Sequence, residues 1–181
     1  MAKKANCKFE YLVSDILNNE YFLETKKDLH HGTNKYEHSL RVAKLSYRLS
    51  KLFKANVKST TRAGLLHDFF IGTRKEKEEN SYLNHPHTAA INAKKFFNVN
   101  LLEEDAIKTH MFHHVMIKKV LPFINRKEKA NFEEMKPKSK EGWIVCISDL
   151  IISGIELERF QFTYIANTIL LLLFNIIMFK N

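Results

Sequence analysis

The hydrophobic positions along this chain recur in steps of three and four residues, which is the spacing of amphipathic helices. The clearest case covers residues 35–53, where apolar side chains fall at Val42, Leu45, Leu49 and Leu52. A stripe of this kind occupies one side of a helix and packs against a core. The pattern therefore predicts a helix here with a buried face.

The same spacing predicts further helices over about residues 9–18, 59–68, 85–97, 100–114 and 140–158. We expect the run Ser59–Thr61 to supply the N-cap of the second of these, and Pro86 to lie in the first turn of the third. Asn100 and Glu103 form a plausible capping box for the fourth. Because only five Gly and three Pro occur in 181 residues, helices are favoured over a strand-and-turn fold, and we predict an all-α protein.

The length and composition predict one domain, with 45% apolar and 27% charged residues. Cys7 and Cys146 lie far apart and outside any CxxC pattern, which favours a reducing interior without a disulfide framework. The N-terminus lacks the apolar core of a signal peptide. We therefore expect a cytoplasmic protein.

Residues 162–179 form an 18-residue stretch without a charge, between Arg159 and Lys180. This length is at the lower edge of a transmembrane helix, and polar residues such as Thr163 and Asn175 interrupt it. We treat residues 161–181 as an apolar C-terminal helix. It would be buried in the core, form a subunit interface or anchor the protein to a membrane.

The net charge of +9 comes mainly from lysine, because 23 of the 29 basic residues are Lys and six are Arg. Proteins that recognise specific nucleic-acid sequences rely on Arg for paired contacts to bases. The lysines are also scattered along the chain. We therefore expect no specific nucleic-acid binding. The lysines form either a solvated surface or a basic rim that attracts a phosphorylated substrate.

The stretch from Leu65 to Asp68 contains the strongest chemical signal, because two leucines precede an adjacent His67 and Asp68. A buried pair of this kind has one common use, which is to bind a metal ion. His38 lies four residues before Val42 and so continues the apolar stripe of its helix. A single histidine on such a face is usually a core residue, so His38 becomes a candidate only because others accompany it.

Three further side chains suit the same centre. His85 lies where a helix is expected to begin, and His110 shares an apolar helix face with Ile107. Asp149 lies within an apolar run, where an unpaired carboxylate would be costly. Imidazole and carboxylate together suit Fe, Mn, Zn or Co, whereas Mg and Ca prefer oxygen alone. The predicted metal ligands are His38, His67, Asp68, His85, His110 and Asp149.

This order of residues resembles the HD-domain phosphohydrolase superfamily, whose pattern is His, then His-Asp, then a distant Asp. The matching residues are His38, His67, Asp68 and Asp149. The resemblance is greatest to a bacterial branch of HD-domain hydrolases with three added segments, which correspond here to His31-Gly32, His85-Pro86 and His110-Met111. It covers about residues 8–160 and implies an HD domain over 1–160, a helical bundle with a central metal site.

The intervening histidines imply two metal ions rather than one. HD proteins that have only the four ligands of the family pattern hold one ion. Branches with extra histidines hold two or more, as in HD-GYP phosphodiesterases and the HD enzymes that cleave diadenosine tetraphosphate. By that comparison, His85 and His110 would complete a second position and Asp68 would bridge the ions. The chain has no Gly-Tyr-Pro signature, so cyclic di-GMP hydrolysis is not supported.

The resemblance leads to a functional hypothesis, a metal-dependent phosphohydrolase that cleaves a phosphomonoester or phosphoanhydride of a small nucleotide-like substrate. A metal-bound hydroxide would attack phosphorus, with Asp68 and His31 as catalytic residues. Arg41 and Lys140 would contact phosphate oxygens, although a solvated role is equally compatible with each. His114 is a further candidate ligand. The alternative is a non-catalytic HD module that binds a nucleotide or acts as a sensor at a membrane. The oligomeric state stays open.

Overall fold

The structure is a computed structural model, and it describes residues 2–30, 33–70, 84–120, 132–157 and 161. The elements are α1 (Ala2–Leu17), α2 (Glu20–Leu23), the 3-10 turn η1 (Glu24–Lys27), β1 (Leu29–His30), β2 (Thr33–Asn34), α3 (Lys35–Leu52), α4 (Val57–Leu66), α6 (His85–Phe96), α7 (Leu101–Thr109), α8 (Phe112–Val120) and α9 (Phe132–Met135). Residues 140–157 form another helix, here called the 140–157 helix. The predicted all-α fold is confirmed, and the two short strands form only a small hairpin.

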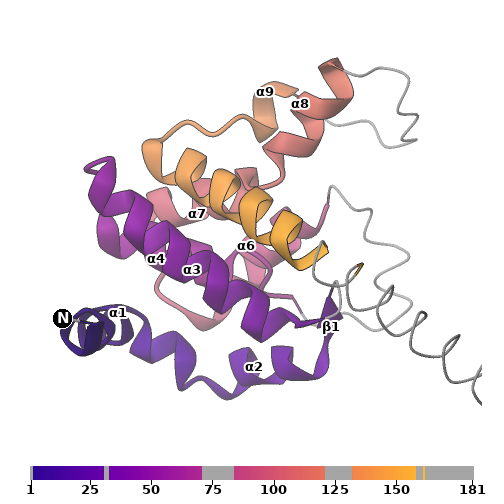
Figure 1. Cartoon of the computed structure of the whole chain (residues 1–181). Coiled ribbons are helices and arrows are strands. Elements are labelled where there is room, and N and C mark those ends of the chain that lie inside the picture. The colour runs from indigo at the N-terminus through magenta and orange to yellow at the C-terminus, as the bar shows by residue number, and fades with distance from the viewer. Residues whose placement is uncertain (1, 31–32, 71–83, 121–131, 158–160, 162–181) are drawn as a thin grey trace, which may run out of the picture.

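The fold is organised around α4, which contacts α1, α3, α6 and α7. In Figure 1, the 140–157 helix crosses the front of the bundle next to α3, while α8 and α9 lie together at one end. All residues of α4 from Ser59 to Leu66 are buried. This helix is therefore surrounded by protein, unlike the amphipathic helices that cover it.

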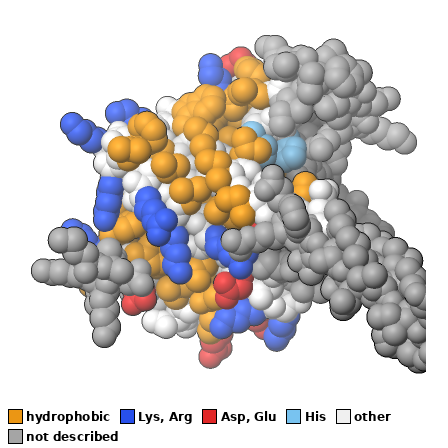
Figure 2. All heavy atoms as spheres, in the orientation of Figure 1, with side chains coloured by type: hydrophobic (Ala, Val, Ile, Leu, Met, Phe, Trp, Pro, Cys, Tyr) orange, Lys and Arg blue, Asp and Glu red, His pale blue; other side chains and the backbone are white. Residues whose placement is uncertain are grey.

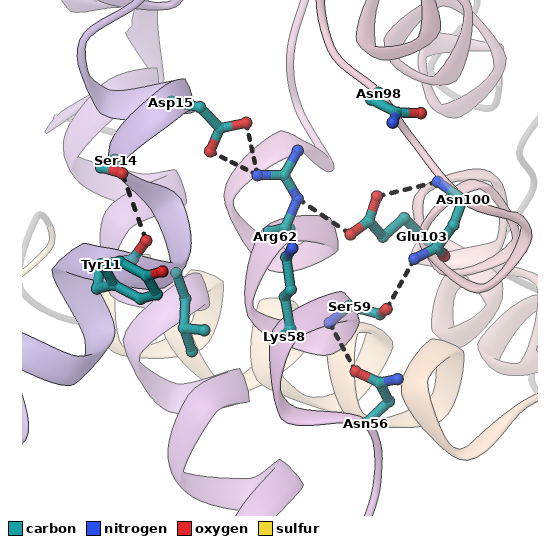
Figure 3. A pocket seen from close by; sticks show the side chains of 11 residues that line it. Tyr11, Ser14, Asp15, Asn56, Lys58, Ser59, Arg62, Asn98, Asn100 and Glu103 are labelled. Atoms are coloured by element: carbon teal, nitrogen blue, oxygen red, sulfur yellow. Dashed lines mark hydrogen bonds and ion pairs between the residues drawn. The ribbon is translucent and has the colours of Figure 1, made fainter.

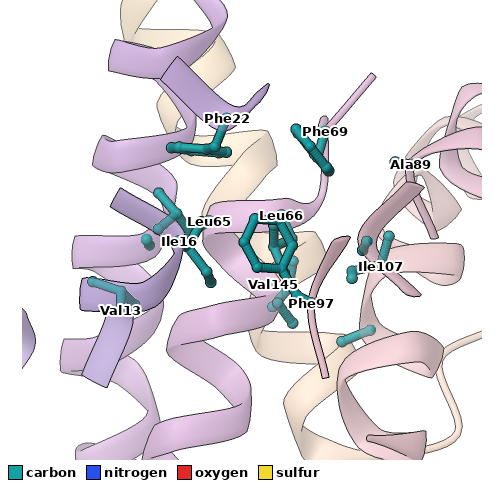
Figure 4. Packing of buried hydrophobic residues seen from close by; sticks show 14 of the residues in the cluster. Val13, Ile16, Phe22, Leu65, Leu66, Phe69, Ala89, Phe97, Ile107 and Val145 are labelled. Carbon is teal, nitrogen blue, oxygen red and sulfur yellow. The ribbon is translucent and has the colours of Figure 1, made fainter. Parts of the chain in front are cut away.

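The main hydrophobic core surrounds the C-terminal half of α4 (Figure 4). Leu65 and Leu66 are fully buried there, against Ile16 of α1, Ile107 of α7 and Val145 of the 140–157 helix. Burying one such side chain contributes roughly 1.5–3 kcal/mol. The core thus fixes the position of the two residues that follow, His67 and Asp68.

Gly64 allows α3 and α4 to approach closely. A Cβ atom at this position would lie 2.9 Å from Ser46 Oγ and 3.2 Å from Ala43 Cα. A larger residue would push α4 away from α3. The glycine therefore sets the separation between His38 on α3 and His67, which lies one turn beyond Gly64.

The helix ends differ from the sequence prediction in one place and agree in another. The N-cap of α4 is Asn56, whose side chain accepts from the Ser59 backbone N–H at 3.0 Å, so the cap predicted within Ser59–Thr61 is wrong. The side-chain oxygen of Asn56, three residues before Ser59, accepts one of the backbone N–H groups that the first turn of a helix leaves free. The capping box of Asn100 and Glu103 is confirmed, with both of its hydrogen bonds present.

The helix predicted over 100–114 is divided into α7 and α8. α7 ends at Thr109 and α8 begins at Phe112. The carbonyl of Ile107, which a continuous helix would offer to Met111, accepts a hydrogen bond from His110 Nδ1 at 2.7 Å. This side-chain bond accompanies the turn and directs the other ring nitrogen of His110 into the protein.

An ion cluster centred on the buried Arg62 joins three helices (Figure 3). Arg62 Nε donates to Glu103 Oε1 of α7 at 3.0 Å, and Arg62 Nη1 donates to both oxygens of Asp15 of α1 at 2.5 and 2.7 Å. Glu103 is only 1% exposed. Burial raises the pKa of Glu103, although Asn100 and Arg62 oppose the shift. The cluster borders a surface cavity of about 570 Å³, and its charges are satisfied within the protein.

Replacement of Arg62 by methionine is expected to destabilise the protein strongly. Glu103 would keep its buried carboxylate without its partner, which costs about 3–5 kcal/mol in comparable pairs. The matched control is Lys94→Met, because Lys94 pairs with Glu104 at 3.0 Å while its side chain is 53% exposed. That surface pair should contribute less than about 1 kcal/mol. Urea unfolding measures both values, and equal losses would contradict the structural role of Arg62.

No helix within the described ranges is long and apolar enough to cross a membrane. The apolar stretch 162–179 lies outside those ranges, so the prediction for residues 161–181 is not tested by the structure.

Candidate metal centre

The six predicted ligands come from five separate segments and meet in the interior. His38 lies in the first turn of α3 and Asp149 in the middle of the 140–157 helix. The other four lie at helix ends: His67 and Asp68 after α4, His85 at the start of α6, and His110 after α7. All of them except His85, which is half-buried, are buried.

The first group of ligand atoms surrounds Asp149. Its Oδ1 lies 3.2 Å from His38 Nε2 and 3.6 Å from His67 Nε2. The side-chain nitrogens and the carboxylate oxygen lie within 4.8 Å of one another, which is close enough to share one ion. These three residues therefore form a candidate metal position.

The second group surrounds Asp68. Its Oδ1 lies 3.3 Å from His85 Nε2 and 3.7 Å from His110 Nε2, and those two nitrogens are 2.9 Å apart. Its other oxygen, Oδ2, lies 3.9 Å from His67 Nε2. The two oxygens of Asp68 thus face different histidine nitrogens. Ligand atoms of His67, Asp68 and His110 also lie within 4.8 Å of one another, so these three residues form a second candidate metal position.

The backbone orients two of the histidines. His67 Nδ1 donates to the Gly64 carbonyl at 2.9 Å, and His110 Nδ1 donates to the Ile107 carbonyl at 2.7 Å. With the proton on Nδ1, each Nε2 presents its lone pair to the centre. His67 Nε2 is buried and has no hydrogen-bond partner in the described part of the chain. Such a buried, unsatisfied nitrogen is costly and fits a bound cation.

The electrostatics of the centre favour positive charge between the carboxylates. Burial would raise the pKa of Asp149, but His38 and His67 hold it well below its usual value. Burial would lower the pKa of His38, but hydrogen bonds to Asp149 and Glu156 raise it to about 10. A proton on His38 thus offsets the negative charge of these carboxylates when no ion is bound. A divalent cation would offset the same charge when the histidines are neutral.

The pKa of His110 is shifted in the opposite direction from that of His38. Burial and the neighbouring His67 and His85 lower its pKa to about 3. The ring is therefore neutral at pH 7, which is the form of histidine that binds a metal.

Glu156 is a site residue that the sequence analysis missed. Its Oε2 accepts from His38 Nδ1 at 2.8 Å, and its Oε1 accepts from Arg41 Nη1 at 2.7 Å. It follows Asp149 by seven residues, which places both carboxylates on one face of the 140–157 helix, two turns apart. That spacing is the sequence signal that would have identified it.

Of the other predicted site residues, Arg41 lies close to the centre and Lys140 does not. Arg41 lies one turn after His38, where it holds Glu156 while its side chain is 40% exposed. Lys140 is not brought to the centre: it begins the helix that carries Asp149, about 13 Å away along the axis, and lines a separate apolar pocket with Phe53. His31 lies outside the described residues.

A cavity of about 280 Å³ opens onto the centre. Its lining combines the ligands Asp68, His85, His110 and Asp149 with Met111, His113, His114, Leu150, Ser153, Gly154 and Leu157. His114 is half-buried in this wall, whereas the buried His113 lies against Cys146 Sγ at 3.7 Å. Figure 2 shows histidine side chains at the surface beside a hydrophobic face. Four of the six candidate ligands thus line this cavity.

The fold and the centre together define an all-helical protein with a buried histidine–carboxylate cluster that could hold a metal ion. A family model described as HD domain matches residues 36–153, which include all six ligands. The chain therefore belongs to the HD-domain family, most of whose members are metal-dependent phosphohydrolases. This confirms the resemblance noted in the sequence. Comparison with curated proteins and with solved structures gave no match.

Glu156→Ala is expected to weaken Mn²⁺ binding by about 10–100-fold, the usual effect of removing a carboxylate that orients a ligating histidine. Without Glu156, the proton of His38 is no longer held on Nδ1, and Arg41 loses its partner. Isothermal titration with Mn²⁺ measures the change. Glu134→Ala, an exposed glutamate on α9, is the control and should bind normally. Normal binding by the Glu156 variant would show that His38 does not need this carboxylate.

Proposed function

We propose that this protein is a metal-dependent phosphohydrolase that cleaves a phosphomonoester or phosphoanhydride bond in a small nucleotide-like substrate. One observation carries the proposal: Asp68 lines a cavity of about 280 Å³, and its two oxygens face different histidine nitrogens, His67 on one side and His85 and His110 on the other. Membership of the HD-domain family supports the same class of chemistry.

The residues present fit a pair of divalent transition-metal ions. His38, His67 and Asp149 would hold one ion, His85 and His110 the other, and Asp68 both. The mixture of imidazole and carboxylate suits Fe, Mn, Zn or Co. When bound, such ions lower the pKa of water and offset the charge that develops on phosphoryl oxygens.

The protein orients the histidine rings and forms a cavity with a partly apolar wall. Backbone carbonyls hold the rings of His67 and His110 so that their Nε2 atoms face the reacting group. Met111, Leu150 and Leu157 form an apolar part of the wall, against which a non-phosphate part of the substrate would pack. His114 also lines the cavity and would hydrogen-bond a substrate oxygen. Arg41, whose side chain is 40% exposed beside Glu156, would bind phosphate, and His31 would transfer a proton to the leaving group.

Asp68→Asn is expected to reduce phosphohydrolase activity by at least about 100-fold, because the amide cannot supply a second anionic oxygen. Activity would be measured on a panel of nucleotides and phosphomonoesters with Mn²⁺, Fe²⁺ or Co²⁺. Lys94→Ala, a surface variant remote from the cavity, is the control. If the purified protein bound no transition metal, the proposal would fail. Tight binding of metal and nucleotide without turnover would instead support the non-catalytic alternative.

His85→Ala is expected to lower the metal content from two ions per chain to one, because His38, His67 and Asp149 remain. Asp149→Ala should remove the other ion. Elemental analysis of the purified variants counts the ions directly, and circular dichroism verifies that each variant is folded. A single ion in the unaltered protein would contradict the two-ion arrangement and leave the one-metal version.

A further inference from the structure

Lys35 is a buried lysine in the first turn of α3, three residues before the candidate ligand His38. The residue is only 2% exposed, and its ammonium nitrogen lies 2.9 Å from Asp28 Oδ2. Its backbone N–H also donates to the Asp28 carbonyl at 2.9 Å. Moving a charged group out of water is costly unless other groups compensate for the lost hydration. The contacts of Lys35 therefore explain why it can be buried, and Asp28 accounts for one part of them.

The same ammonium group makes two contacts with one further residue, Phe70. Lys35 Nζ donates to the Phe70 carbonyl at 3.0 Å, and it lies over the Phe70 ring, 3.1 Å from the ring centre. A cation over the face of an aromatic ring is attracted to it. Because one group contacts both the backbone and the ring of Phe70, it holds the direction of this side chain relative to α3.

Phe70 in turn contacts two candidate metal ligands. Its backbone N–H donates to the Asp68 carbonyl at 2.8 Å. Its ring centre lies 5.5 Å from that of the His85 imidazole, and the two ring planes are inclined by 33°. A chain of direct contacts thus leads from Lys35 through Phe70 to His85, the candidate ligand that begins α6.

We propose that Lys35 is a positioning residue for the metal centre, which acts through the ring of Phe70 on the ring of His85. It would thereby set the affinity of the ion position that we assign to Asp68, His85 and His110. The side chain of His85 is 13% exposed, whereas those of the other two are 5% and 1% exposed. A ligand with a more open environment depends more on each neighbour. The inference rests on the metal binding of the proposed function, but not on turnover.

A purely structural role for Lys35 would have different consequences. Its pair with Asp28 would then stabilise the start of α3, whatever Phe70 contacts. Loss of the lysine would weaken both ion positions alike, because α3 also carries a ligand of the position around Asp149. Positioning through Phe70 acts on His85 and leaves the Asp149 position unchanged. The relative affinities of the two ion positions therefore distinguish these roles.

The first test is calorimetric titration of the full chain with Mn²⁺, in which His85→Ala identifies the binding step that needs His85. Lys35→Met should weaken this step at least about 10-fold, as removal of groups that orient ligands usually does. The other step should change by less than about threefold, because its ligands keep their contacts. The matched control is Lys51→Met: Lys51 is an exposed lysine in the last turn of α3, 3.7 Å from the centre of the Tyr47 ring, and its loss should leave both steps unchanged.

Equal weakening of both steps by Lys35→Met, or no weakening, would overturn this inference alone. A single binding step in the unaltered chain would also overturn it, because the position that depends on His85 would not exist. If the unaltered chain bound no Mn²⁺, the proposed function would fail together with the inference. Circular dichroism verifies that each variant is folded.

A second test examines the route through Phe70. Phe70→Leu removes the ring but keeps the carbonyl that accepts from Lys35, and it should weaken the same step at least about 10-fold. Because both residues act through one ring, their effects should not add: Lys35→Met combined with Phe70→Leu should be no more than about threefold weaker than the weaker-binding single variant. Losses that multiply in the double variant would show independent roles and overturn the proposal.

Discussion

Two buried carboxylates, Asp68 and Asp149, set the main constraint on this structure. A carboxylate in a protein interior is costly unless positive charge lies beside it. Here, that requirement explains why histidines arrive from α3, α4, α6 and α7 at one point. Protons on His38 or bound cations can each provide the charge. The neutral ring of His110 and the Nε2 of His67, which has no hydrogen-bond partner in the described part of the chain, both fit a bound cation.

The backbone around the metal centre sets the positions and orientations of the histidine rings. Gly64 brings α4 against α3, and the same residue's carbonyl orients the ring of His67. The break between α7 and α8 has a parallel effect, because the carbonyl of Ile107 orients His110. Packing and ligand orientation therefore depend on the same short segments. A substitution that moved α4 by a fraction of an ångström would also disturb the ligands.

The sequence predicted the centre well where a ligand follows a local pattern. His38 continues an apolar stripe, and His67 and Asp68 follow two core leucines, so periodicity alone placed them inside. Glu156 was missed because its sequence signal is only the seven-residue spacing from Asp149. The sequence does not show that His38, more than 100 residues away, lies beside it. The position of Lys140 was not evident from the sequence for another reason. A basic residue at a helix start suggests phosphate binding, but this helix start lies about two and a half turns from Asp149, beside a separate apolar pocket.

The 140–157 helix connects the functional parts of the molecule, because its faces have different surroundings. Asp149 and Glu156 point to the metal ligands, Leu150 and Gly154 line the cavity, and Ile151 and Ile155 face outward. Asp149 Oδ1 lies 3.2 Å from His38 Nε2, so a shift of this helix against α3 would change the spacing of the candidate ligands. The packing of this one helix therefore sets both the wall of the cavity and the geometry of the metal centre.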